Sequence, residues 1–202
     1  AETGEFKMKR AGPEDPVRHQ SSIMEMLDIS SSGAGLYPQM VQRMLSAAEV
    51  IAMPNDIQMI LARPKNEIIV HFPVLMDDGE HRMYTGYRIQ HNDALGPFKG
   101  GMRFAPQMSQ SDLGGLAMLM MLKCALLRLP FGGAAGGVVC DPRVLSRDEL
   151  MGVVRRYASS IAHHIGPDYD IPGPDVGADS QVMAWFADTA SQMTPDRNRQ
   201  GM

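Results

Sequence analysis

Two lysines lie where an ammonium group could hold a carboxylate ligand. Lys99 is the only lysine in residues 86–106 (GYRIQHNDALGPFKGGMRFAP), a segment rich in Gly, Pro and Asn whose backbone can bend closely around a small ligand. Lys123 follows an apolar run and precedes Cys124, so we expect it to emerge near the buried side of a helix. The ordinary alternatives are a solvated surface lysine at position 99 and a side chain that snorkels to solvent at position 123.

Two carboxylates, Asp170 and Asp175, flank prolines in residues 170–179 (DIPGPDVGAD), which have the composition of a tight loop. In such loops aspartate commonly caps a turn or a helix. Residue type and spacing alone therefore give these two side chains a structural role.

The glycine run 132–137 (GGAAGG) suggests a phosphate-binding loop, but neither nucleotide motif fits. The dinucleotide motif needs Gly at positions i, i+2 and i+5, a spacing that occurs nowhere in the chain. A Walker loop needs Lys and then Ser or Thr after Gly137, where Val138 and Val139 stand. The run instead predicts close approach of the backbone to another element or ligand.

The elements that must position these residues include four helices, predicted from apolar residues at spacings of three and four. The first three cover residues 37–53, 109–129 and 146–165, and each stops near a proline. The second and third open with capping-box patterns, at Ser109 to Asp112 and at Ser146 to Glu149. A last helix is expected to start near Asp179 or Ser180.

Strands are predicted on either side of the second helix. Residues 67–76 and 81–90 are rich in β-forming side chains and are joined by Asp77-Asp78-Gly79, a hairpin signal. Residues 137–141 (GVVCD) suit a short buried strand. Strands followed by helices that alternate with strands predict an α/β fold, with helices on both faces of one sheet.

Composition predicts a folded globular domain and excludes several classes of partner. The chain has 202 residues, 44% of them hydrophobic and 21% charged. Its net charge of −4 and the lack of a Lys/Arg-rich face argue against nucleic-acid binding, and no apolar stretch is long enough to span a bilayer. Residues 1–36 are expected to form a flexible N-terminal arm, and residues 194–202 a tail.

The two cysteines, Cys124 and Cys140, lie in apolar surroundings without a C-x-x-C pair or clustered histidines. They are expected to be buried free thiols without a metal or redox role. We expect a cytoplasmic protein. Because residue 1 is alanine rather than methionine, removal of a leader, and hence the mitochondrial matrix, stays open as an alternative.

Four segments, in order and at matching separations, resemble the N-terminal substrate-binding and dimerisation domain of the glutamate dehydrogenases. They are residues 86–106, 116–142 (LAMLMMLKCALLRLPFGGAAGGVVCDP), 145–150 (LSRDEL) and 170–185 (DIPGPDVGADSQVMAW). The resemblance covers about Ser46 to Met193. It implies a three-layer α/β/α domain over residues 37–193, with a mixed sheet, that assembles with itself.

The resemblance also implies roles for individual residues. Lys99 matches the lysine that holds the side-chain carboxylate of glutamate or 2-oxoglutarate, and Lys123 matches the lysine that holds the α-carboxylate. Asp175 matches the aspartate that transfers protons at the α-amino centre. Leucine and phenylalanine dehydrogenases, which look similar elsewhere, have an apolar residue in place of Lys99, so a dicarboxylic ligand is expected.

The chain departs from the family at its most reactive position. The family pattern G-G-(G/A)-K-G-G reads G-G-A-A-G-G here, so Ala135 stands where the resemblance places the catalytic lysine. None of the five lysines lies after Lys123 to replace it. The dinucleotide-binding domain that follows in the family, and would hold NAD or NADP, has no counterpart among these residues. We therefore expect no cofactor site in this chain and no catalysis by the chain alone.

Three functional readings follow from the resemblance. The chain could derive from an NAD(P)-dependent glutamate dehydrogenase, the enzymes that oxidatively deaminate L-glutamate to 2-oxoglutarate and ammonia. It could be a silent paralogue that binds a dicarboxylate and regulates a full-length partner by co-assembly. It could also be a structural remnant that folds and oligomerises.

Overall fold

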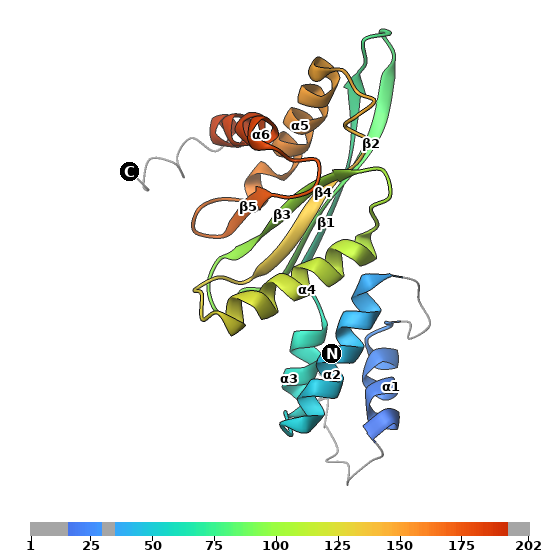
Figure 1. Ribbon diagram of the computed structural model, residues 1–202, viewed down its shortest axis with the longest axis vertical. Helices are drawn as coiled ribbons and strands as arrows, with labels where there is room; N and C mark the ends of the chain where they lie inside the picture. The colour runs from blue at the N-terminus through green and yellow to red at the C-terminus, as the bar shows by residue number, and fades with distance from the viewer. Residues whose placement is uncertain (1–15, 30–34, 194–202) are drawn as a thin grey trace, which may run out of the picture.

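The domain is built around one mixed sheet with helices on both faces (Figure 1). The computed structural model describes residues 16–29 and 35–193. Helix α4 covers one face of the sheet, and α5 and α6 cover the other, while α1, α2 and α3 form a separate group beyond α4 (Figure 1). This arrangement confirms the three-layer α/β/α fold expected from the sequence.

The sheet has five strands in the order β1-β2-β4-β3-β5. Strands β1 and β2 form the predicted hairpin, and β4 pairs antiparallel with β2 but parallel with β3, which in turn pairs parallel with β5. The strands span Asn66–Leu75, His81–Asn92, Phe98–Ala105, Gly133–Val139 and Asp170–Pro174 for β1 to β5.

Four of the six α-helices in the described residues lie where apolar spacing predicted a helix, whereas the helices at residues 16–26 and 55–62 were not predicted. The six helices span Pro16–Met26 (α1), Leu36–Val50 (α2), Asn55–Ala62 (α3), Gln110–Leu126 (α4), Arg147–Ile161 (α5) and Ser180–Met193 (α6), with a 3₁₀ turn at Ala162–His164 (η1). Both predicted capping boxes are present: the side chains of Ser109 and Ser146 accept from the amides of Asp112 and Glu149. Each cap satisfies an amide that the first helical turn leaves without a partner.

Three apolar clusters hold the layers together. One joins the sheet to α5 and α6 around Tyr157, and a second joins the sheet to α4 around Leu113 and Ala117. The third packs α1, α2 and α3 against the outer side of α4 around Leu45 and Met118. Because α4 contributes to two clusters, it is held firmly against the sheet face on which the candidate residues lie.

The prediction of a flexible arm over residues 1–36 is wrong for its described second half. Residues 16–26 form α1, and Ile23, Met24, Leu27 and Ile29 are buried in the cluster with α2. Ile23 and Met24 lie in the last turns of the helix, Leu27 and Ile29 lie just after it, and docking on α2 offsets the entropy cost of ordering this segment. Residues 1–15, 30–34 and the predicted tail 194–202 lie outside the described residues.

Strands β3 and β5 were not predicted, and β4 begins four residues before the predicted strand. The glycine run belongs to β4, which begins at Gly133 and ends at Val139, earlier than the predicted strand 137–141. Residues 170–174, at the start of the predicted loop 170–179, form β5. In β4 a Cβ on Gly133 would lie 2.3 Å from the carbonyl oxygen of Ala117, so the glycine lets α4 pack directly on the strand.

Candidate functional site

Strand β3 carries the residues of the candidate site on its face toward α4. Its burial alternates: Phe98, Met102 and Phe104 are buried, whereas Lys99, Gly101 and Arg103 are half-buried. Met102 and Phe104 pack in the cluster with α5, which places the intervening residues on the opposite face. Lys99, Gly101 and Arg103 therefore point to the same side of the sheet.

Helix α4 leaves part of that face open. It packs mainly on β2 and β4, through contacts of Leu113 and Ala117 with Ile89 and Ala135, and only marginally on β3. The side chains that β3 presents beside α4 are consequently accessible to a ligand. We call this accessible face of β3 and the adjoining β5 segment the β3–β5 strip.

Lys99 extends over the β3–β5 strip. It pairs with Ile171 of β5, and its Nζ lies 3.5 Å from where a Cβ on Gly173 would stand. Burial raises the pKa of the Cys124 thiol, and the charge of Lys99 opposes this rise, so the ammonium group also lies near α4. Within residues 16–29 and 35–193, Lys99 has no ion pair, and its donors remain available to an anion.

Asp175 follows β5 and lies directly over Gly101. A Cβ on Gly101 would stand 2.7 Å from Asp175 Oδ2, so the missing side chain creates the room that the carboxylate occupies. The Nε of Arg103 donates to Asp175 Oδ2 at 2.7 Å, and the Val176 amide donates to Oδ1 at 2.8 Å. The Phe104 amide donates to Val176 O at 2.9 Å and thereby fixes this segment against β3.

Ala135 lies on the same sheet face as Lys99, one strand further in. Met102 pairs with Gly136 in the parallel ladder, so Ala135 neighbours Gly101 on the adjacent strand. The Ala135 side chain is 4% exposed and packs with Ile89, Leu113 and Ala117. The order across the sheet is therefore Ala135, Gly101 and Asp175. The methyl group of Ala135 supplies neither a charge nor an exchangeable proton to this part of the face.

Lys123 is exposed in the last turn of α4, contrary to the expectation that it emerges near the buried side. It neighbours Cys124, whose thiol feels the charge of Lys99. No hydrogen bond or ion pair joins Lys123 to Lys99, Asp175 or any other group in the described chain. The structure brings Lys99, Ala135 and Asp175 onto one face and leaves Lys123 at its border.

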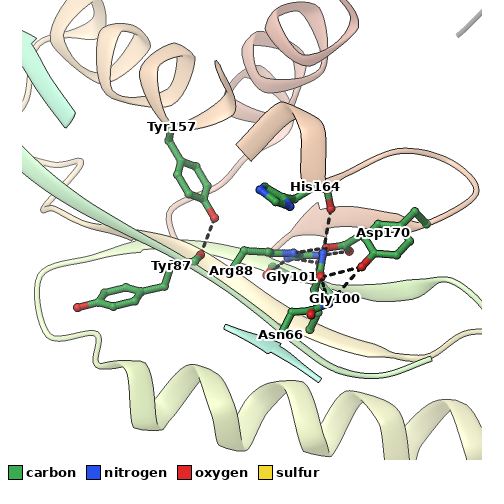
Figure 2. A network of polar contacts seen from close by, with 10 residues as sticks. Asn66, Tyr87, Arg88, Gly100, Gly101, Tyr157, His164 and Asp170 are labelled. Carbon is green, nitrogen blue, oxygen red and sulfur yellow. Dashed lines mark hydrogen bonds and ion pairs between the residues drawn. The ribbon is translucent and has the colours of Figure 1, made fainter. Parts of the chain in front are cut away.

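A buried polar network supports the site from the other face of the sheet (Figure 2). Arg88 of β2 donates to both oxygens of Asp170, from Nε at 2.8 Å and from Nη2 at 2.5 Å. Its Nη1 donates to the carbonyls of Gly100 and Gly101 at 3.4 and 3.3 Å. Gln90 Nε2 donates to Asp170 at 2.8 Å and to the His164 carbonyl at 2.9 Å. One arginine thereby ties β2, β3 and the start of β5 together.

The environment of Arg88 keeps it charged. Burial alone lowers the pKa of this guanidinium, but the adjacent Asp170 carboxylate raises it above the ordinary arginine value. Tyr157 of α5 donates to the Tyr87 carbonyl at 2.6 Å, and burial raises the pKa of its hydroxyl, so it stays a neutral donor (Figure 2).

Sequence reasoning missed Arg88 and Arg103. Arg88 stands in a predicted strand of alternating residues, but its carboxylate partner comes 82 residues later. Arg103 lies in a segment predicted as loop, and its partner is 72 residues away. The only available signal was the alternation of apolar and polar residues in FKGGMRFA, which the glycines obscure.

Two cavities in the described part of the chain do not include the candidate residues. One of about 630 Å³ is bordered by the α1–α2 region and the start of β1, including Tyr37, Arg63 and Glu67. Another of about 350 Å³ lies between β5 and α6, including Asp170 and Phe186. Neither is lined by Lys99, Lys123, Ala135 or Asp175, so cavity size alone does not identify the candidate site.

Comparison with known proteins decides the family. Residues 64–192 match the family described as Glu/Leu/Phe/Val dehydrogenase, dimerisation domain. The chain belongs to this family. Among curated glutamate dehydrogenases, the NADP(+)-dependent enzyme of Pyrobaculum calidifontis is 54% identical over 145 residues, covering 72% of this chain and 34% of that protein. That of Thermotoga maritima is 47% identical over 156 residues, covering 77% of this chain and 38% of that protein.

Solved glutamate dehydrogenases share the fold. The hetero-hexameric enzyme of Thermus thermophilus, in a leucine-bound form, superposes with a TM-score of 0.73 at 41% identity, covering 92% of this chain and 40% of that one. Glutamate dehydrogenase 2 of Plasmodium falciparum gives a TM-score of 0.84 at 26% identity, covering 93% and 42%. The chain thus spans well under half the length of the dehydrogenases that it matches.

The described residues give three further observations. Both cysteines are buried and free. Among residues 16–29 and 35–193, no group of three or more His, Cys, Asp or Glu side chains could hold a metal ion, and no helix is long and apolar enough to cross a membrane.

Proposed function

We propose that this chain is a glutamate dehydrogenase-type substrate domain that binds glutamate or 2-oxoglutarate but lacks the group needed for dehydrogenation. The main support for the proposal is the arrangement of Lys99, Asp175 and Ala135 on the sheet. Lys99 and Asp175 lie on one accessible face, with Ala135 on the adjacent strand under α4. By the family resemblance, the first two match substrate-site residues and Ala135 matches the catalytic lysine.

Binding in this proposal rests on charge. Lys99 holds the side-chain carboxylate, and Lys123, at the end of α4, reaches for the α-carboxylate from the border of the strip. Each charge-assisted contact contributes about 1.5 to 3 kcal/mol, against several kcal/mol lost on immobilising a small ligand. The balance gives roughly millimolar affinity.

The proposed loss of catalysis follows from the side chain of Ala135, a methyl group that cannot act as an acid or a base. In oxidative deamination the family lysine polarises the carbonyl and activates water, and removing one general acid–base group costs about 10²- to 10⁴-fold in rate. Matched relatives include an NADP(+)-dependent enzyme and an NAD-specific one, so NAD and NADP are the two cofactors to test with this chain. In this proposal Asp175 keeps its place in the site but lacks the lysine that, by the resemblance, makes proton transfer there productive.

A spectrophotometric assay tests this part of the proposal. Purified protein with glutamate and NAD or NADP should produce no reduced nicotinamide above the protein-free background, whereas a lysine-bearing relative assayed in parallel should. Turnover that survives a second purification would show that Ala135 does not abolish the reaction.

A regulatory role is the second candidate, because one similar structure is a hetero-hexamer in a leucine-bound form. In this reading the chain co-assembles with a full-length dehydrogenase and alters its activity. Mass photometry of the chain mixed with such an enzyme should reveal complexes of intermediate mass. If the masses and the kinetics of the enzyme are both unchanged, the regulatory role is rejected. The chain is then a dicarboxylate-binding domain, or a structural remnant if no dicarboxylate binds.

A further inference from the structure

The larger of the two cavities lies between the helices α1–α3 and the sheet layer, and Lys99 does not line it. Its volume of about 630 Å³ is in the usual range of small-molecule sites. One side is formed by the segments that follow α1 and α3 and by the start of α2, the other by the start of β1 and the first turns of α4. We call it the interlayer cavity, because a molecule bound there would touch both layers.

Part of the lining of the interlayer cavity is apolar. Tyr37 is fixed there, because its hydroxyl donates to Ala62 O at 2.5 Å and its ring lies edge-on to the buried ring of His91. The other apolar residues of the lining are Leu27, Ile29, Pro38 and Pro64. A fixed aromatic ring among aliphatic side chains favours a ligand with an apolar body.

Charged side chains of both signs line the same cavity: Arg63, Lys65, Asp28 and Glu67. Lys65 is already paired with Asp93. Arg63 donates through Nη2 to Leu27 O, and its other donors have no partner among the described residues. The Asp28 carboxylate has no ion pair in the same part of the chain. One cation and one anion of the cavity are therefore available to a ligand.

These two available charges lie at the same end of the cavity. Asp28 follows Leu27, the residue whose carbonyl oxygen accepts from Arg63, yet the two charged groups form no ion pair with each other. Burial and the Glu67 carboxylate raise the pKa of the Tyr37 hydroxyl, and Arg63 opposes this rise, so the guanidinium also lies near the aromatic ring. A guanidinium, a carboxylate and an aromatic ring thus surround one space.

We propose that the interlayer cavity binds a zwitterionic small molecule with an apolar body, its carboxylate at Arg63 and its ammonium group at Asp28. A ligand with several charges of one sign would meet like charges on the wall, because the lining has two cations and two anions. An α-amino acid with a large apolar side chain is the simplest molecule with this pattern. The site shares no residue with the β3–β5 strip and does not depend on the proposed dicarboxylate site.

Ligand-observed NMR titration with three matched probes tests the proposal. L-Tryptophan carries both charged groups, indole-3-propionate lacks the ammonium group, and tryptamine lacks the carboxylate. We expect L-tryptophan to bind the wild-type chain about fivefold more tightly than either analogue, the size of one partly exposed ion pair.

Variants assign each end of the ligand to a residue. Arg63→Met should lower the affinity for L-tryptophan to that for tryptamine, and Arg63→Lys should recover part of the loss by restoring the charge. Asp28→Asn should lower it to that for indole-3-propionate, and asparagine suits the left-handed backbone at this position, where φ is 56°. Arg43→Met, at an exposed position of α2 outside the cavity, should leave all three affinities unchanged.

The outcomes also separate this site from the proposed function. If L-tryptophan does not bind, or binds no more tightly than both analogues, the proposal is wrong. It is also wrong if Arg63→Met or Asp28→Asn keeps the wild-type affinities with circular dichroism unchanged. If Lys99→Ala weakens L-tryptophan binding as much as Arg63→Met does, the probe occupies the β3–β5 strip and the proposal is overturned. Binding of L-tryptophan without any binding of 2-oxoglutarate would support this site and reject only the dicarboxylate site.

Discussion

The guanidinium of Arg88 and the carboxylate of Asp170 form an ion pair whose two side chains are both fully buried. The pair lies under β3, on the opposite face from Lys99, and links strands that are 82 residues apart in sequence. Because Arg88 also holds the carbonyls of Gly100 and Gly101, the pair fixes the backbone that carries the candidate site.

Asp170→Asn should destabilise the domain strongly. The amide keeps the shape of the side chain but leaves the buried Arg88 charge unpaired, which costs about 3 to 5 kcal/mol in free energy of unfolding. The matched control is Asp188→Asn, which breaks the half-exposed pair with Arg155 and should cost about 1 kcal/mol or less. Urea denaturation of both variants measures the difference, and equal losses would contradict the account of Arg88.

Gly101→Ala should weaken ligand binding while the domain stays folded. The new methyl group would stand 2.7 Å from Asp175 Oδ2, so the partly exposed carboxylate must move, and Arg103 with it. We expect affinity for 2-oxoglutarate to fall roughly fivefold, the scale of a disturbed, partly exposed charge pair. Gly114→Ala is the control, because its methyl group would lie 3.3 Å from the Tyr37 ring, on the side of α4 that faces α2. Wild-type affinity in Gly101→Ala would show that the position of Asp175 does not matter.

His91 should make stability depend on pH. The ring is 1% exposed, its Nε2 donates to Leu61 O at 2.9 Å, and its Nδ1 has no partner in the described chain. Burial lowers the pKa of His91 below the ordinary 6.5, so the unfolded chain binds a proton in a range where the folded chain does not. Stability from this residue is present above about pH 6.5 and falls, by up to about 1.4 kcal/mol per pH unit, as the pH drops toward the folded pKa.

His91→Gln isolates this effect. Glutamine keeps a donor for Leu61 O and does not titrate, so the variant should lose less stability than wild type between pH 7.5 and 5.5 in urea denaturation. His81→Gln, on the exposed hairpin, should lose as much as wild type. Identical pH profiles for all three proteins would rule out His91 as the titrating group.

The elements that could be predicted from the sequence are those in which apolar residues recur at the helical or strand period. Helices α4 and α5 have apolar stripes and Ser-led capping boxes, so their starts were predicted within a residue or two. The strands built from glycine and proline could not be predicted this way. β4 is buried because neighbouring strands and α4 approach its backbone closely, a property of those partners rather than of the segment. β5 is only partly buried and lies at the edge of the sheet, where pairing with β3 makes it a strand.

The residues of the candidate site also fall into those that the sequence predicted and those that it missed. Residue type and family resemblance pointed to Lys99 and Asp175, which the fold places on one strip, and to Ala135 beside them. The partners that hold these residues were missed, because Arg103 and Asp175 meet only when β3 and β5 pair. Ion pairs between segments that are far apart in the chain produce no periodic pattern of residue types in the sequence.

Self-association stays a prediction, and the structure changes which surface should mediate it. From the resemblance, both the helix carrying Met40 and Met44 and the hairpin from Glu67 to Gln90 were expected to make subunit contacts, but Met40 and Met44 are buried within the chain. The hairpin is the better candidate, because β1 is an edge strand and Ile69, Leu75 and Met83 are 45%, 59% and 64% exposed. Ile69→Lys should shift the mass in light scattering toward 22.1 kDa, while Val144→Lys, at an exposed loop, should not. A wild-type chain that is monomeric in concentrated solution would reject self-association.

The central claim is that β3 carries a carboxylate site although Ala135 stands where the resemblance places the catalytic lysine. Titration of 2-oxoglutarate into the wild-type chain, Lys99→Ala and Lys65→Ala tests it most directly, since Lys65 pairs with Asp93 and lies over the Phe98 ring, whereas Lys99 has no ion pair in the described chain. We expect roughly millimolar binding to the wild type and to Lys65→Ala, a loss of about tenfold or more in Lys99→Ala, and no binding of leucine. Absence of binding far above millimolar concentration, or equal affinity in Lys99→Ala and wild type, would contradict the claim.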